Sequence, residues 1–226
     1  MDKAKLNELQ RKALPHVIAV VLFLIISYAY FSPQLEGKKL ESSDVSHFKG
    51  TSKELVDYRE KNNEEALWTN RLFGGMPAYL ISVKLKNNIF MYVNNLLQIG
   101  SRPASYVFIA LLSFYLALLA FGVSPWLSIV GAIAYAFSSY YFIILGVGHM
   151  TKAVAIAYLP GVIAGVYHTY RKKMWLGAAM TALFLGLQLK AFHPQITYYT
   201  AIVIIIIGIT EFIKAIKPLN LLPFLK

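Results

Sequence analysis

Three short polar segments separate long apolar blocks of the sequence, and they carry the residue types that could do chemistry. They are residues 43–47, 148–152 and 190–195. A carboxylate such as Asp44 can take a proton from a hydroxyl group as a general base, and lysines can stabilise an anionic leaving group. These residue types would suit acid–base chemistry beside an anion, and the candidate residues are Asp44, His47, His149, Lys152, Lys190, His193 and Gln195.

Each candidate also has a structural interpretation. Asp44 fits the cap of a turn, and Lys190 fits the C-terminal end of a helix, where its charge suits the helix dipole. His193 precedes a proline at a chain reversal, where backbone groups are its usual partners. Lys152 differs, because it falls in the first turn of a predicted helix, where a cation opposes the dipole. This placement predicts an anionic partner, either Asp44 or a ligand phosphate, with His149 on the same helix face.

The sequence lacks the signatures of soluble enzymes. It has no glycine-rich phosphate loop, no HExxH, no GxSxG and no pair of ligands at metal spacing. Without cysteine, disulfides and cysteine-bound metals are excluded. The net charge of +11 does not indicate nucleic-acid binding, because the charges lie in tails and loops between apolar blocks. The lipid bilayer is the partner that this distribution predicts.

The elements that must position these residues are membrane spans. The chain is 57% hydrophobic and 15% charged, whereas soluble chains hold about 25% charged residues. Residues 103–151 contain no Asp, Glu, Lys or Arg and are broken at 122–125. A span needs about 20 apolar residues. We therefore predict an all-α, polytopic transmembrane bundle of about six spans at 15–31, 103–121, 126–145, 153–170, 174–191 and 196–213.

Two features define the predicted ends of this bundle. The first span is read as an uncleaved helix with Pro15 in its first turn, because residues 32–34 do not form a signal-peptide cleavage site. Basic residues gather in the tail 1–14, at 171–173 and in the tail 214–226. By the positive-inside rule both termini are cytoplasmic. The loop 32–102 and all three polar segments then share the outer face.

The outer loop 32–102 is predicted to contain short amphipathic helices. Residues 51–54 fit a capping box that starts a helix running to about residue 62. Residues 74–77 predict a turn with the aromatic anchors Trp68, Phe73 and Tyr79. Further on, apolar and polar residues fall on opposite helix faces. This helix lies either in the membrane interface or against the bundle. The apolar face holds Leu85, Ile89, Tyr92, Val93, Leu96 and Leu97, and the polar face Asn87, Asn94, Asn95 and Gln98.

Several of these segments resemble the bacterial YfhO membrane proteins. The similarity covers essentially the whole chain, and the stretch from the tryptophan to GGMP is its most specific part. The matching segments are LPHVIAV at 14–20, YFSP at 30–33, SDV at 43–45, LWTN at 67–70, FGGMPAY at 73–79, AFSSY at 136–140, GHMTK at 148–152 and HPQITYY at 193–199.

The resemblance implies a GT-C-like glycosyltransferase of the bacterial plasma membrane. Such enzymes move a sugar from a polyprenyl-phosphate carrier to an acceptor outside the membrane, here a cell-envelope polymer. Asp44 matches the acidic residue that serves those enzymes as catalytic base or as ligand of a divalent metal. Family members are several times longer, so the resemblance also implies that this chain is an N-terminal portion, inactive or incomplete alone.

A non-enzymatic membrane protein, either half of a transporter or an envelope scaffold, is the alternative. A transporter places ionisable groups near the middle of the membrane. The predicted spans 103–121 and 126–145 contain no Asp, Glu, Lys or Arg, and the polar cluster lies at the outer face. This distribution favours chemistry at the membrane surface over transport.

Overall fold

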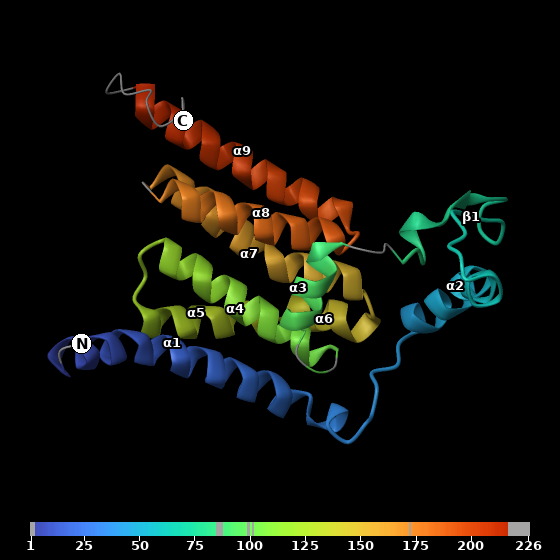
Figure 1. The fold of residues 1–226 in the computed structure, drawn as a ribbon, viewed down its shortest axis with the longest axis horizontal. Helices are drawn as coiled ribbons and strands as arrows, with labels where there is room; N and C mark the ends of the chain where they lie inside the picture. Colours follow the sequence, from blue (N-terminus) through green and yellow to red (C-terminus); the bar gives the residue numbers. More distant parts are fainter. Residues whose placement is uncertain (1–2, 85–87, 99, 101, 172, 217–226) are drawn as a thin grey trace.

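The long helices of the chain lie side by side in one bundle, and a small lobe extends from one end of it (Figure 1). The computed structural model describes residues 3–84, 88–98, 100, 102–171 and 173–216. The predicted all-α class is confirmed. α1 begins and α9 ends at the end of the bundle opposite the lobe. The bundle helices are α1 (Lys3–Tyr30), α4 (Ala104–Ala120), α5 (Pro125–Ala136), α6 (Ser139–Val147), α7 (Met150–Tyr170), α8 (Met174–Lys190) and α9 (Pro194–Ile216).

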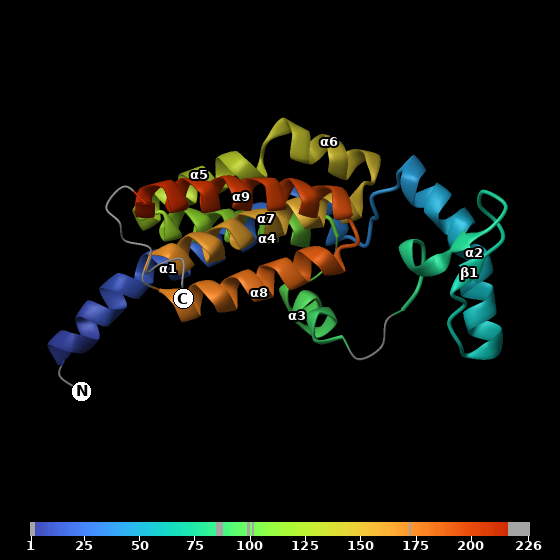
Figure 2. The same ribbon diagram turned by 90° about the horizontal axis from the view of Figure 1, so that it is seen from above.

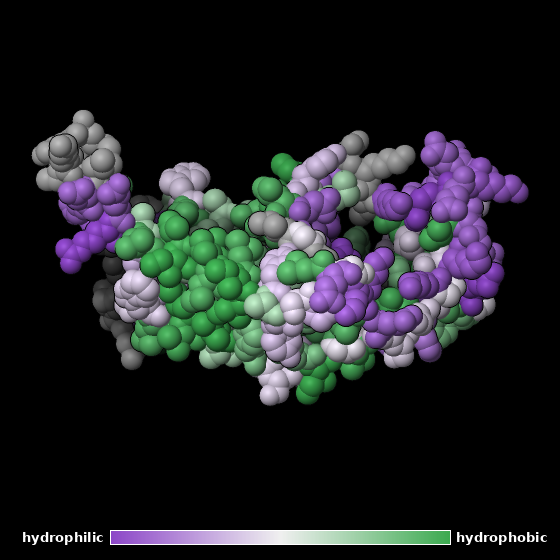
Figure 3. All heavy atoms as spheres, turned by 90° about the horizontal axis from the view of Figure 1, so that it is seen from below, coloured by the Kyte–Doolittle hydropathy of each residue, from purple (hydrophilic) through white to green (hydrophobic). Residues whose placement is uncertain are grey.

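Three of these helices, α1, α7 and α9, are each long and apolar enough to cross a membrane. α5 and α6 together make a fourth candidate, bent by 44° at the break between them, and α4 and α8 are shorter apolar helices. α7 is largely buried, whereas α1 and α9 expose most of their apolar surface. Figure 3 shows apolar side chains over the middle of the bundle and polar ones over the lobe. Exposed apolar surface of this extent is what lipid covers in a membrane protein.

α1 starts earlier than the predicted span. It begins at Lys3, so most of the predicted tail 1–14 is helical and Pro15 lies inside the helix rather than in its first turn. The residues before Pro15 are mostly good helix formers, and Lys12 pairs with Glu8 one turn earlier at 2.7 Å. Figure 2 shows this first part of α1 projecting beyond the bundle. The tail residues 217–226 lie outside the described residues.

Small residues bring α7 and α8 into close contact. A Cβ atom on Gly165 would lie 2.5 Å from the backbone nitrogen of Thr181, and one on Gly177 would lie 2.4 Å from that of Thr169. Helices in membranes associate through such small residues, because lipid supplies no hydrophobic driving force between them. The α7–α8 pair is therefore closely packed, with the largely buried α7 on the inside of the bundle.

A proline inside α7 is accommodated by neighbouring side chains. Pro160 has no N–H, so the carbonyl of Ile156 loses its helical donor. The Tyr135 hydroxyl of α5 donates to that carbonyl at 2.9 Å. The next amide, Gly161 N–H, donates to Ser113 Oγ of α4 at 2.8 Å. Side chains of α4 and α5 thus satisfy backbone groups of α7, as neighbouring helices do around prolines in membrane spans.

The lobe consists of a helix and a hairpin joined by polar contacts. Arg59 donates to both carboxylate oxygens of Glu65 at 2.6 and 2.8 Å, and the buried Thr69 donates to Glu54 at 2.6 Å. The first contact joins the C-terminal part of the helix to the segment that follows it, and the second joins the middle of the helix to the hairpin. The elements are η1 (Ser32–Gln34), α2 (Ser43–Asn62), the antiparallel pair β1 (Trp68–Thr69) and β2 (Met76–Pro77), and η2 (Ala78–Leu80).

The predicted start of the lobe helix is wrong. α2 begins at Ser43, and the Ser42 side chain caps it by accepting from the Val45 amide. Thr51 and Ser52 lie inside the helix, where their hydroxyls bond to carbonyls of the preceding turn. A helix-interior serine or threonine often makes this bond instead of capping.

The predicted glycine turn of the lobe is present, but its aromatic residues are not buried anchors. Gly74 and Gly75 both have positive φ. Phe73 is 94% exposed, and Trp68 and Tyr79 are each about half exposed. Trp68 packs against Gly75, where a Cβ atom would lie 2.8 Å from the indole nitrogen. Glycine at this position thus lets the indole lie flat on the turn.

Candidate functional site

Asp44 and His149 meet at the lobe end of the bundle. His149 Nδ1 lies 2.9 Å from Asp44 Oδ2, and both side chains are about half exposed. Asp44 lies in the first turn of α2, and His149 directly precedes α7. A half-exposed carboxylate held by an imidazole is open to a ligand and can accept a proton from it.

A glycine allows this contact. Gly148 ends α6 in the left-handed conformation, with φ of 100°. A Cβ atom there would lie 2.1 Å from Ser42 Oγ and 3.3 Å from Asp44 Cβ. The N-terminus of α2 therefore rests directly on the turn between α6 and α7. Residues more than 100 positions apart in the sequence come together through this contact.

An ion pair between Lys152 and Asp44 was one of the two predicted alternatives, and the structure does not form it. The Lys152 ammonium lies over the Tyr140 ring of α6, 5.3 Å from the centroid. Among the described residues, the ion pair of Asp44 is made with His149, and no Asp44–Lys152 pair is present. The ring face attracts the ammonium through its negative potential, a partner that the sequence analysis did not predict.

His193 lies close to the same turn. Its Nδ1 atom is 3.5 Å from Thr151 Oγ1, and its Nε2 atom is buried without a hydrogen-bond partner among the described residues. Burial lowers the pKa of His193, and the nearby charges of Lys152 and His149 lower it further. His193 is therefore neutral at pH 7 and adds no positive charge beside Lys152.

Two cavities adjoin the Asp44–His149 pair. The first, of about 610 Å³, is lined by both residues and by three cations, Lys39, Lys49 and Arg102. The second, of about 290 Å³, shares Arg102 with the first and adds Lys190; its lining contains no acidic residue. Cations that outnumber acids in a partly apolar cavity favour an anionic, amphiphilic ligand.

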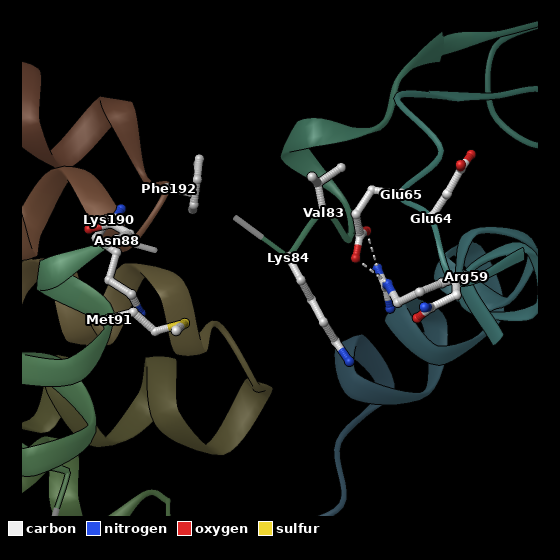
Figure 4. A pocket seen from close by; sticks show the side chains of 10 residues that line it. Arg59, Glu64, Glu65, Val83, Lys84, Asn88, Met91, Lys190 and Phe192 are labelled. Carbon is white, nitrogen blue, oxygen red and sulfur yellow. Dashed lines mark hydrogen bonds and ion pairs between the residues drawn. The ribbon is translucent and has the colours of Figure 1, made fainter. Parts of the chain in front are cut away.

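A third cavity, of about 540 Å³, separates the lobe from the bundle (Figure 4). The paired Arg59 and Glu65 line it from the lobe, and Asn88, Met91 and Lys190 line it from the bundle. Lys190 thus borders two adjoining cavities. Lys152 and His193 line none of these three cavities, so the predicted candidates do not all face one space.

The other two candidates lie apart from the pair. His47 is exposed on α2 and lines none of the three cavities. Gln195 donates to Tyr199 at 2.9 Å within the first turns of α9. Among the described residues, no group of three or more His, Asp or Glu side chains is arranged to hold a metal ion.

Arg102, like Lys39 and Lys49, lines the cavity of Asp44 but was missed by the sequence analysis. It lines the two cavities beside Asp44, lies 5.5 Å from the centroid of the Tyr106 ring, and contacts Gln98 at 3.3 Å. Its position directly before Pro103, at the start of a long uncharged stretch, was the available signal. A cation at the polar end of a span is well placed to meet lipid phosphate.

The fold and the site define a helical membrane protein with a polar site at one end of its bundle. No protein-family model matches the chain, and neither a curated protein nor a solved structure matches it.

Proposed function

We propose that the chain is a GT-C-like membrane glycosyltransferase, or the N-terminal portion of one. It transfers a sugar from a polyprenyl-phosphate carrier to a cell-envelope acceptor on the outer face of a bacterial plasma membrane. The observation that carries the proposal is the half-exposed Asp44–His149 pair, which lines a cavity together with three cations at the lobe end of the bundle. The resemblance to the YfhO proteins gives the substrate class.

In the proposed reaction, Asp44 accepts the proton of an acceptor hydroxyl. The hydroxyl oxygen then forms a bond to the anomeric carbon of the sugar, and the bond from that carbon to the phosphate oxygen of the carrier breaks. The electron pair leaves on the carrier phosphate, where Arg102 and Lys190 stabilise the charge. His149 positions the carboxylate by donating from Nδ1. Lys39 and Lys49 extend the cationic lining around the pair.

The proposed topology has six spans: α1, α4, the α5–α6 pair, α7, α8 and α9. Both termini are cytoplasmic, and the lobe is outside. Supporting this orientation, α1 begins and α9 ends at one end of the bundle, opposite the lobe. Arg171 and Lys214 share that end, where both contact Glu211. The positive-inside rule assigns this basic end to the cytoplasm.

Replacing the carboxylate tests the proposal. Asparagine keeps the shape of Asp44 but cannot act as a base, so Asp44→Asn should lower sugar transfer about 10²–10⁴-fold. The assay measures transfer from polyprenyl-phosphate glucose in reconstituted vesicles, together with binding of a photoreactive polyprenyl phosphate. Asp57→Asn is the matched control, because Asp57 lies on the same helix, exposed and paired with Lys53.

Four outcomes separate the alternatives. Loss of transfer with retained lipid binding in Asp44→Asn alone supports the base. Wild-type transfer by Asp44→Asn rules out the carboxylate. Lipid binding without transfer by the wild type supports a donor-binding portion that needs the rest of a longer protein. Neither binding nor transfer favours the scaffold or transporter alternative.

A further inference from the structure

The short helix α3 (Ile89–Leu97) presents an apolar stripe to the outside of the protein. Ile89 is 69% exposed, Tyr92 61% and Leu96 75%. At 100° per residue these three side chains fall within an arc of about 60°. No Asp, Glu, Lys or Arg occurs between Ile89 and Leu97. An uncharged stripe of large apolar side chains on a helix surface marks a contact with something apolar.

The other flank of α3 is firmly attached to the bundle. Phe90 fills the space beside Gly186 of α8, where a Cβ atom would lie 2.2 Å from the ring. The buried Asn94 accepts hydrogen bonds from Tyr158 and Gln98, both at 3.0 Å. Asn94, which was predicted to lie on the polar face, thus points into the bundle. The predicted face residues Leu85 and Asn87 lie outside the described residues. The exposed stripe therefore belongs to a fixed element.

The position of α3 indicates what covers the stripe. Figures 1 and 2 show α3 crossing α8 near the lobe instead of running along it. Gly186 precedes Lys190, the last residue of α8, by four positions, which at 1.5 Å per residue is about 6 Å. If α8 spans the bilayer, α3 lies roughly in the membrane plane, about one helical turn below the outer ends of the spans. Amphipathic helices embed about 5–10 Å into the boundary between headgroups and acyl chains.

We propose that α3 is an in-plane membrane helix whose partner is the lipid bilayer itself. Ile89 and Leu96 insert among the acyl chains, and Tyr92 keeps its hydroxyl at headgroup level, as tyrosines at membrane interfaces do. Lys190 and Arg102, which line the adjoining cavity, lie beside lipid phosphates. This places the opening of that cavity at the headgroup layer. The proposal requires that the bundle spans a membrane, and it does not depend on sugar transfer.

The absence of cysteine from the sequence makes a direct test simple. Single cysteines at Tyr92 and Leu96 would carry a nitroxide label in the full chain, reconstituted in phosphatidylcholine–phosphatidylglycerol vesicles. Power-saturation spectroscopy measures collisions of the label with oxygen, which concentrates in lipid, and with a water-soluble nickel chelate. Lys53, exposed on the lobe helix α2, is the matched control position.

We expect labels at Tyr92 and Leu96 to collide preferentially with oxygen, at a depth of about 5–10 Å. The label at Lys53 should collide preferentially with the nickel chelate. Labels at Tyr92 and Leu96 that behave like the one at Lys53 would overturn the proposal, because the stripe would then face water. Labels protected from both reagents would also overturn it, because a protein partner would then cover the stripe. All three positions are exposed, so the labels disturb no packing.

Discussion

Replacing Gly148 with alanine tests how the Asp44–His149 site is assembled. Gly148 has φ of 100°, in the left-handed region, which costs a residue with a side chain about 1–2 kcal/mol. The new Cβ atom would also lie 2.1 Å from Ser42 Oγ, so the Ser42 hydroxyl that caps α2 must rotate away or the N-terminus of α2 must shift. We therefore expect Gly148→Ala to lose about 1–2 kcal/mol of stability and to separate Asp44 from His149. For a chain of this size that is roughly 2–8 °C in Tm.

Gly146→Ala is the matched control, since Gly146 lies in the same helix and a Cβ atom there meets nothing within 4 Å. Thermal unfolding in lipid nanodiscs gives the stability. Spin labels on cysteines at Ser46 of α2 and Ser139 of α6, both exposed, give the distance between the two elements. If the two alanine variants unfold at the same temperature and show the wild-type distance, the contact at Gly148 does not hold the site together.

Two further predictions concern the lobe and the bundle. The hydrogen bond from Arg59 lowers the pKa of Glu65, so this pair stabilises the lobe fully above the unfolded pKa of about 4.3, and the stabilisation is lost as the pH falls through the lowered pKa of the folded state. Glu65→Gln should reduce hydrogen-exchange protection of the lobe at pH 7 and flatten its acid dependence; an unchanged profile contradicts this. Tyr135→Phe leaves the Ile156 carbonyl without a donor and should cost about 1–3 kcal/mol in thermal unfolding. The exposed Tyr198→Phe, which should cost nothing, is the control.

Hydropathy predicted the helices of the bundle well, because a membrane span depends on a local property of the sequence. The bend between α5 and α6 and the early start of α1 were not predicted. The uncharged block 126–145 contains no proline in its interior, and the serine pair 138–139, where Ser138 is the N-cap residue of α6, is the mark of the break that hydropathy overlooks. α1 continues towards the N-terminus because helix propensity, not hydropathy, decides where a polar helix begins.

The site was harder to predict than the spans, because it depends on contacts between distant segments. The sequence indicated that the segments at 43–47 and 148–152 share one end of the bundle. It could not show that Gly148 touches Ser42, nor that Lys152 turns towards the Tyr140 ring. The first contact depends on how α2 meets the turn before α7, and the second on how α6 packs beside α7, and no local pattern encodes either. Arg102 was missed although its place before Pro103, at the start of the uncharged stretch, was a local signal.

The partner that Asp44 has is better suited to the proposed chemistry than the lysine that the sequence suggested. A carboxylate in contact with a permanent cation is stabilised in its charged form and becomes a weaker base. A histidine can orient the carboxylate through an Nδ1–H bond without carrying a full charge. Arg102 and Lys190 line a neighbouring cavity that contains no acid. Arg102 also lines the cavity of Asp44, so the group that would accept the proton lies beside one that would bind the phosphate, as sugar transfer from a lipid phosphate to an acceptor hydroxyl requires.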